Sequence, residues 1–265
     1  MKLHTLGKFF AVAAAVVWLS MSTYSLAATI NEIRLDQGGA DNDEYFELAG
    51  APSESLDGLS YVVIGDGTGS GLGGAVESII GLSSLVIPAD GYFLAVEDTF
   101  TGGGSPDLTL SGSGMSQTLN FENSDNVTHL LVRGLNAAIH AGDGFGGSAT
   151  DLDVNDDGII DATGDWDGDT VDDGAPWAAI LDSVALSENV PMEDLVYSST
   201  IVGPDGTFLP GHVFRFPNGN GPWHIGDFNF PTDDTPGVAN IPEPLTSALS
   251  LLGLFTCVAL RRRTR

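Results

Sequence analysis

The chain reads Thr29-Ile-Asn-Glu-Ile33, then an acidic turn at Asp41-Asn-Asp-Glu44, then Tyr45-Phe-Glu-Leu48. A further turn at Leu56-Asp-Gly58 leads into Leu59-Ser-Tyr-Val-Val-Ile64. Each apolar run is short, contains β-branched or aromatic residues, and is bounded by turn-forming residues, which is typical of β-strands. These residues therefore predict three successive strands.

Similar runs recur along the chain and predict an all-β domain. Helical periodicity is scarce, and many of the 35 glycines lie between the apolar runs together with Asp, Ser and Pro. Short strands at this spacing are typical of a β-sandwich. Further strands are expected at Leu85–Ile87, Tyr92–Val96, Gln117–Phe121, His129–Val132, Ile180–Leu186, Thr207–Leu209 and Val213–Phe216.

The charge of the chain is divided unevenly between its ends and its middle. The formal net charge is −27, from nine basic and 36 acidic residues. Residues 28–240 keep only Arg34, Arg133 and Arg215, whereas every acidic residue except Glu243 lies there. Because such a surface repels phosphate backbones, nucleic acid is not expected as a partner, and divalent cations are the natural counter-charge.

Residues 28–240 contain no cysteine. The single cysteine, Cys257, lies in an apolar run near the C-terminus. Residues 28–240 therefore offer no disulfide, thiolate nucleophile or cysteine-based metal site.

Residues 1–27 have the three parts of a secretory signal peptide. Lys2 and Lys8 give a positive start, the run Phe9–Leu19 is apolar, and Ser25-Leu-Ala27 places small residues before a cleavage point. Signal peptidase is expected to cut after Ala27. The chain is therefore predicted to be exported.

The last 25 residues combine a short motif, an apolar run and a basic cluster. The motif is Pro242, Glu243 and Pro244, and the apolar run 245–260 is expected to be a transmembrane helix about 24 Å long. Positive charge stays on the cytoplasmic side of a membrane, so the helix is expected to leave residues 28–240 outside the cytoplasm. The basic cluster consists of Arg261, Arg262, Arg263 and Arg265.

This order of parts over residues 241–265 resembles the PEP-CTERM sorting signal. The resemblance implies that an exosortase recognises the chain at Pro242, Glu243 and Pro244. It also implies transient anchoring in the inner membrane, followed by a location at the cell envelope or outer surface, or secretion to the extracellular or biofilm matrix, where extracellular polysaccharide is a candidate partner. The final location after processing stays open.

A second resemblance covers residues 28–240. Ile30-Asn-Glu-Ile33, Glu44-Tyr-Phe-Glu-Leu48 and Leu56-Asp-Gly-Leu-Ser-Tyr61 resemble the opening of a lamin-tail domain, and Thr235-Pro-Gly-Val-Ala-Asn240 resembles its end. The resemblance implies an immunoglobulin-like β-sandwich with an acidic insertion at about 140–177. It treats Glu44 and Glu47 as part of the fold signature and not as a catalytic pair.

The densest chemistry lies in the insertion, where two acidic loops align with a shift of twelve residues. Both loops place oxygen-bearing side chains at positions 1, 3, 5 and 9, a spacing that can converge on one hard cation such as Ca²⁺. Gly158 occupies position 6 of the first loop, where the backbone must turn sharply. The predicted calcium ligands are Asp153, Asn155, Asp157, Ile159 and Asp161 in the first loop, and Asp165, Asp167, Asp169 and Asp173 in the second.

These loops resemble EF-hand, dockerin and thrombospondin type 3 calcium loops, with two departures. Position 12 of the first loop is Gly164 and not an acid, and position 6 of the second loop is Thr170 and not glycine. No amphipathic helices flank them, so we expect one or two ions in a single or shared site, with Asp165 bridging the loops. The alternative is an acidic loop that binds no ion and repels itself.

Three functions are compatible with the sequence. The favoured one is a non-enzymatic structural or adhesion module stabilised by calcium. The second is a calcium-dependent carbohydrate-binding protein, in which Trp166, Trp177 and Trp223 could stack on sugars, although packing is the commoner role of such residues. The third is a secreted hydrolase of nuclease or phosphatase type. No catalytic residues are predicted, because no histidine lies in a zinc-binding pattern and no serine in a hydrolase motif.

Overall fold

The structure is a computed structural model that describes residues 27–40, 42–65, 73–111, 119, 121, 123, 125–142, 149–188 and 195–241. The signal peptide up to residue 26, and the sorting motif, apolar run and basic cluster from residue 242 onward, lie outside the described residues. None of the described segments forms a helix with the length and apolarity needed to cross a bilayer.

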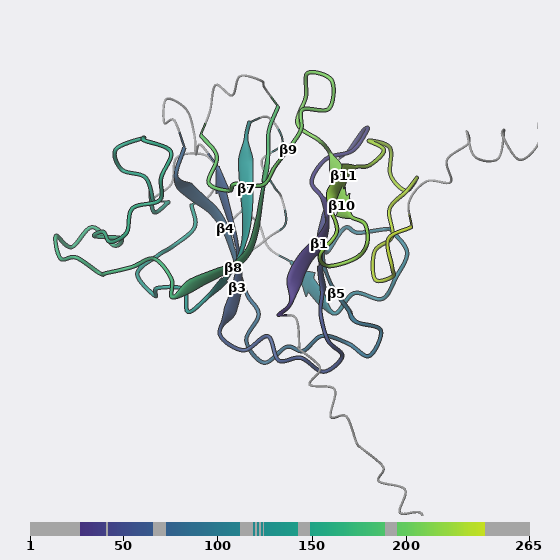
Figure 1. Cartoon of the computed structure of the whole chain (residues 1–265), viewed down its shortest axis with the longest axis horizontal. Coiled ribbons are helices and arrows are strands. Elements are labelled where there is room, and N and C mark those ends of the chain that lie inside the picture. The colour runs from purple at the N-terminus through teal and green to yellow at the C-terminus, as the bar shows by residue number, and fades with distance from the viewer. Residues whose placement is uncertain are drawn as a thin grey trace, which may run out of the picture.

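The described part of the chain is all-β, as predicted, and its strands form two sheets that face each other (Figure 1). One sheet has the order β11-β10-β1-β2-β5-β6, and the other has the order β4-β3-β7-β8-β9. The strands are β1 Thr29–Arg34, β2 Tyr45–Ala49, β3 Leu59–Gly65, β4 Ala75–Gly81, β5 Tyr92–Glu97, β6 Leu108–Leu110, β7 Val127–Arg133, β8 Ala179–Leu186, β9 Ile201–Val202, β10 His212–Arg215 and β11 Trp223–Ile225.

Two of the predicted strands are wrong. Leu85–Ile87 and Thr207–Leu209 contribute only isolated bridges, Ser55 with Val86 and Asp205 with Phe208. Asp205 and Phe208 are separated by a two-residue turn, whereas Val86 lies between a turn at 83–84 and Pro88, which has no N–H to extend a ladder. Most of the run predicted at 117–121 lies outside the described residues. Strands β4, β6, β9 and β11 were not predicted.

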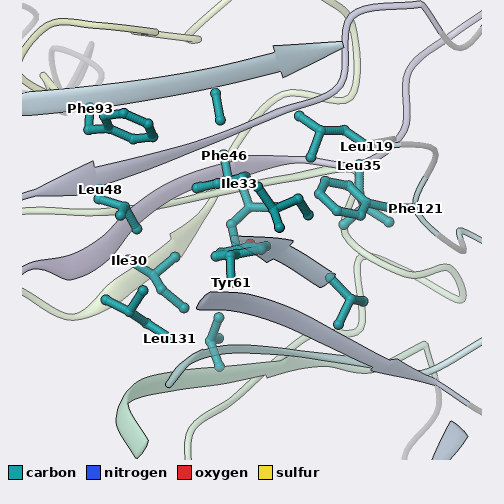
Figure 2. Packing of buried hydrophobic residues seen from close by; sticks show 14 of the residues in the cluster. Ile30, Ile33, Leu35, Phe46, Leu48, Tyr61, Phe93, Leu119, Phe121 and Leu131 are labelled. Carbon is teal, nitrogen blue, oxygen red and sulfur yellow. The ribbon is translucent and has the colours of Figure 1, made fainter. Parts of the chain in front are cut away.

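The main core lies between the two sheets. Phe46 of β2 stacks on Tyr61 of β3 across the interface, with ring centroids 3.8 Å apart (Figure 2). Residues two apart on a strand point to the same face, so Phe46 and Leu48 face this core whereas Tyr45 and Glu47 face the other side of their sheet. The two sheets are therefore packed as a sandwich.

Both sheets are also covered on their outer faces. Val62 and Ile64 of β3 turn a second apolar face away from the main core, and Leu152 and Trp166 of the acidic insertion pack against it. The outer face of the six-stranded sheet carries buried charged side chains beside an apolar cluster of Tyr45, Leu94 and Val96, and it is covered by residues 227–240, called here the C-terminal strap. In Figure 1 the insertion lies beyond the five-stranded sheet on the left, and the yellow-green strap lies beyond β10 and β11 on the right.

Candidate metal centre

The two acidic loops are anchored on the outer face of the five-stranded sheet. Trp166, at position 2 of the second loop, is 3% exposed and belongs to the same apolar cluster as Leu130 and Val132 of β7. Its indole Nε1 donates to the carbonyl of Gly174 at 2.8 Å. Burial of the Trp166 side chain attaches the second loop to strand β7, so this loop is an ordered part of the fold.

The first loop winds around the carboxylate of Asp153. Its Oδ1 accepts a hydrogen bond from the backbone N–H of Asp157 at 3.1 Å, and its Oδ2 accepts one from Gly158 at 2.8 Å. The side-chain oxygen of Asn155 also accepts from Asp157 N–H at 3.1 Å, and Oδ2 of Asp161 accepts from Val154 N–H at 3.2 Å. Ordered side-chain oxygens therefore line the inside of this turn.

The second loop repeats this pattern twelve residues later. Asp165 Oδ1 accepts from Asp169 N–H at 3.0 Å, and its Oδ2 accepts from Thr170 N–H at 2.7 Å. Asp167 also accepts from Asp169 N–H, at 3.1 Å, and Asp173 Oδ2 accepts from Trp166 N–H at 2.8 Å. The two loops thus share one backbone conformation, although only the first has glycine at position 6.

Backbone angles show the same repeat. Asp156 and Gly168, both at position 4, have φ of 54° and 79°, and Gly158 and Thr170, both at position 6, have φ of 80° and 74°. A β-branched residue such as Thr is an outlier in this left-handed region. The second loop therefore keeps the turn of the first at the cost of strain at Thr170.

Replacing that residue, Thr170→Gly, is expected to raise the free energy of unfolding by roughly 0.5–1 kcal/mol. Relief of the left-handed strain contributes roughly 1–2 kcal/mol, and the greater chain entropy of glycine offsets part of it. Urea denaturation measures the change. The matched control is Thr163→Gly, because Thr163 is exposed in the same insertion and is absent from the positive-φ residues. If Thr170→Gly lowers the free energy of unfolding as much as Thr163→Gly does, Thr170 is not strained.

The structure brings three of the predicted ligands into one group. Carboxylate oxygens of Asp165, Asp167 and Asp173 lie within 4.8 Å of one another. In this group Asp165 serves the second loop, and none of the groups found among the described residues joins it to the first loop as a bridge. The remaining predicted ligands are Asp153, which is buried, Asp161, which is half-buried, and Asn155, Asp157, Ile159 and Asp169, which are exposed.

Sequence reasoning missed a further partner of the first loop, Tyr197. Its hydroxyl donates to Asp153 Oδ2 at 3.0 Å, and the aromatic ring packs against the same apolar cluster as Trp166. Burial and the neighbouring carboxylate of Asp153 raise the pKa of Tyr197. The hydroxyl therefore stays protonated and orients the carboxylate. No local motif could have found a contact across 44 residues.

A second cluster of ionisable groups, also missed, lies under the C-terminal strap. Oxygen and nitrogen atoms of Glu32, His212 and Asp234 lie within 4.8 Å of one another. Arg34 forms an ion pair with Asp234, its Nη2 lying 2.6 Å from Oδ2, and His212 Nε2 lies 2.9 Å from Glu32 Oε1. This cluster already holds its own positive charge, so it does not call for a metal ion.

Buried groups in the cluster perturb one another strongly. Burial alone would lower the pKa of His212, but hydrogen bonds to Asp233 and Glu32 raise it to about 9. Burial would likewise raise the pKa of Glu32, whereas the hydrogen bond and charge of His212 lower it below its ordinary value. The pKa of Glu47 is raised well above normal by burial and by the charge of Glu32. His212 is therefore an imidazolium, and burial favours the protonated form of Glu47.

Other predicted features have structural roles. Glu47 accepts hydrogen bonds from Asn31 and Gly237, and Glu44 accepts one from Phe121 N–H, so both acids are tied into the fold. Trp166 is in the core, whereas Trp177 and Trp223 are half-buried. Arg215 pairs with Asp182 at 2.8 Å.

Of the predicted processing residues, only Ala27 is described, and it is exposed. Pro242, Glu243, Pro244, Arg261, Arg262 and Arg263 lie outside the described residues. Comparison of the chain with models of protein families, with curated proteins and with solved structures finds no match.

Proposed function

We propose that the chain is an exported, non-enzymatic surface or matrix protein whose β-sandwich is stabilised by calcium bound in the acidic insertion. The observation that carries the proposal is the repeat of one loop geometry at a spacing of twelve residues. The repeat extends to the backbone, since positions 4 and 6 have positive φ in both loops.

The chemistry of the loops fits calcium better than magnesium. Calcium accepts six to eight oxygen ligands in flexible cages, whereas magnesium retains several waters in strict octahedral geometry. Residues 151–174 carry ten aspartates and no basic residue, so the loops need a counter-charge. The half-buried pair Asp161 and Asp173 closes each loop onto its position 2, which keeps the carboxylates together.

The proposal includes a lamin-tail-like sandwich of the immunoglobulin type. Contacts between the two quoted ends of the domain support it. Asn240 Nδ2 donates to the carbonyl of Asn31 on β1 at 3.3 Å and to that of Arg215 on β10 at 2.9 Å, and Gly237 N–H donates to Glu47 Oε2 on β2 at 2.7 Å. The segment 235–240 therefore docks on the strands that carry the opening motifs, as a domain ending would.

The proposed location rests on the two ends of the chain. Cleavage after Ala27 would release a domain that begins one residue before strand β1, at Ala28, which is fully buried. Sorting through Pro242, Glu243 and Pro244 would act on a segment that follows Asn240 directly. Both processing sites would then lie at the borders of the folded domain.

Calorimetric titration of the full chain with calcium tests the proposed ligands. The variant Asp157→Ala with Asp169→Ala removes position 5 from both loops, and we expect calcium affinity to fall about tenfold or more. The matched control is Asp156→Asn with Asp172→Asn, which removes the same number of charges from residues outside the predicted set. Asn also tolerates the positive φ of Asp156. If the two variants lose equal calcium affinity, the insertion attracts calcium only through its overall negative charge and does not form a specific site.

A further inference from the structure

The C-terminal strap is held to the six-stranded sheet by buried polar contacts and by the apolar packing of Phe230. Thr235 N–H donates to Glu32 Oε1 at 2.9 Å. Arg34 Nε and Nη2 donate to the two carboxylate oxygens of Asp234 at 2.8 and 2.6 Å. Gly237 and Asn240 add the contacts described above. An apolar contact is made by Phe230 with Phe100. The polar part of this attachment therefore depends on charge, whereas Phe230 packs against the apolar cluster of Tyr45, Leu94 and Val96.

His212 is the link between strap and sheet. The ring is fully buried, with Nε2 lying 2.9 Å from Glu32 of β1 and Nδ1 lying 3.1 Å from Asp233 of the strap. A neutral imidazole has one N–H donor, whereas two carboxylates at these distances need two. The geometry therefore requires the doubly protonated ring. A Cβ at Gly226 would come within 2.0 Å of Nδ1, so the ring packs directly against the backbone of Gly226.

Every element packed around His212 supplies groups that depend on its charge. These groups are Glu32 and Arg34 on β1, Tyr45 on β2, and Asp233 and Asp234 on the strap, while His224 of β11 is separated from the ring by Phe214. Burial raises the pKa of Tyr45 well above normal, so Tyr45 stays neutral at alkaline pH. When His212 loses its proton, three carboxylates share one remaining cation, Arg34.

We propose that the C-terminal strap is a clasp that protonated His212 holds closed, and that loss of this proton releases the strap from the sheet while the core between the sheets stays folded. The stated geometry, with one cation lying between a strand carboxylate and a strap carboxylate, makes the strap the element that loses its partner. Because the chain continues from the strap to its C-terminal tail, the clasp sets whether the tail leaves from a fixed point. The inference does not depend on the calcium proposal.

The pH window follows from the direction of the shift. The pKa of His212 rises from 6.5 to about 9 in the folded protein, so its stabilisation is fully present below pH 6.5 and is lost as pH rises through about 9. The clasp is therefore closed in neutral and mildly acidic solution, where Glu32 and Asp233 are ionised, and opens in alkaline solution.

Hydrogen exchange of the full chain, read by mass spectrometry and corrected for intrinsic rates, tests the clasp. We expect protection of the backbone amides in residues 227–240 to fall about tenfold or more between about pH 7 and about pH 10.5. Protection in β3 and β7 of the same sample should change far less. Unchanged strap protection, or a loss shared equally by β3 and β7, overturns the proposal.

Variants of single residues test whether His212 causes the pH-dependent change in strap protection. In His212→Gln, the amides of the strap should already have low protection from hydrogen exchange at neutral pH. Their protection should then show no further decrease, or step, as the pH rises. His224→Gln, an exposed histidine on the neighbouring strand, should behave as the unmodified chain does. If His212→Gln does not fold, Asp233→Asn removes only the strap carboxylate that lies 3.1 Å from His212 Nδ1 and should move the step to lower pH. A step that stays in place in Asp233→Asn contradicts the clasp, as does a step abolished by His224→Gln.

Discussion

Removing calcium from the full chain with a chelator is expected to lower its melting temperature by about 5–10 °C relative to a calcium concentration about a hundred times Kd. A ligand that binds only the folded state contributes about 2.7 kcal/mol at that ratio. For a domain of this size, each kcal/mol shifts the melting temperature by roughly 2–4 °C. This is one of the two largest effects that the structure leads us to expect.

The effect should be coupled to the outer face of the five-stranded sheet. Val62, Val76 and Leu130 are fully buried there, beneath Leu152 and Trp166 of the acidic insertion. Without a counter-charge the aspartates of the insertion repel one another and weaken this cover. Binding of an apolar fluorescent dye should therefore increase when calcium is chelated, at a temperature where the main core is still folded.

Controls separate ion binding from general charge screening. Asp157→Ala with Asp169→Ala should retain at most about half of the calcium-dependent shift, because a tenfold higher Kd leaves about 1.4 kcal/mol at the same calcium concentration. The control pair Asp156→Asn with Asp172→Asn should retain the calcium-dependent difference. Magnesium at equal concentration should give a smaller shift, because it dehydrates reluctantly. If the unmodified chain melts at the same temperature with calcium and with chelator, the acidic insertion covers the sheet without binding calcium.

Replacing the buried arginine, Arg34→Met, is expected to lower the free energy of unfolding by about 3–5 kcal/mol, because it leaves a buried carboxylate without its cation. All five N–H donors of Arg34 are used. Two reach Asp234, and the others donate to the carbonyls of Asp36, Asp227 and Phe228 at 3.1–3.2 Å. The side chains of Arg34 and Asp234 are only 1% and 0% exposed, so water cannot replace these contacts.

The chain provides its own matched control for this variant. Arg133 lies exposed at the end of β7, and Arg133→Met should change stability by less than about 0.5 kcal/mol. A double variant, Arg34→Met with Asp234→Leu, should recover part of the loss, since replacing both members of a buried ion pair costs less than removing one. Urea denaturation measures all three. If Arg34→Met unfolds no more easily than Arg133→Met, the strap is not held by charge.

The sequence reveals the strands with clear local signals and misses those that depend on context. β2 and β3 combine aromatic and β-branched residues between turns, and both were predicted. β4 reads Ala-Val-Glu-Ser-Ile-Ile-Gly, and its buried polar pair Glu77 and Ser78 hides the strand pattern. β6, β9 and β11 contain two or three residues each and form only because longer neighbours pair with them.

The candidate site was predictable where spacing along the chain determines it. Positions 1, 3, 5 and 9 recur in the sequence, and the loop hydrogen bonds follow them closely. The cover formed by Trp166 and the contact of Tyr197 were not predictable, because both depend on residues far away in the chain. The same reason hides the clasp, in which Glu32 and His212 are 180 residues apart. The sequence also gives no sign that the strap buries Glu32 and Arg34 of β1, both of which are 0% exposed.

Calorimetric titration of the unmodified full chain with calcium, repeated with magnesium, tests the proposed metal centre most directly. The loop geometry predicts saturable binding of calcium at a defined stoichiometry of one or two ions, with weaker binding of magnesium. Absence of saturable calcium binding, or equal binding of the two ions, would contradict the proposal that the acidic insertion is a calcium site.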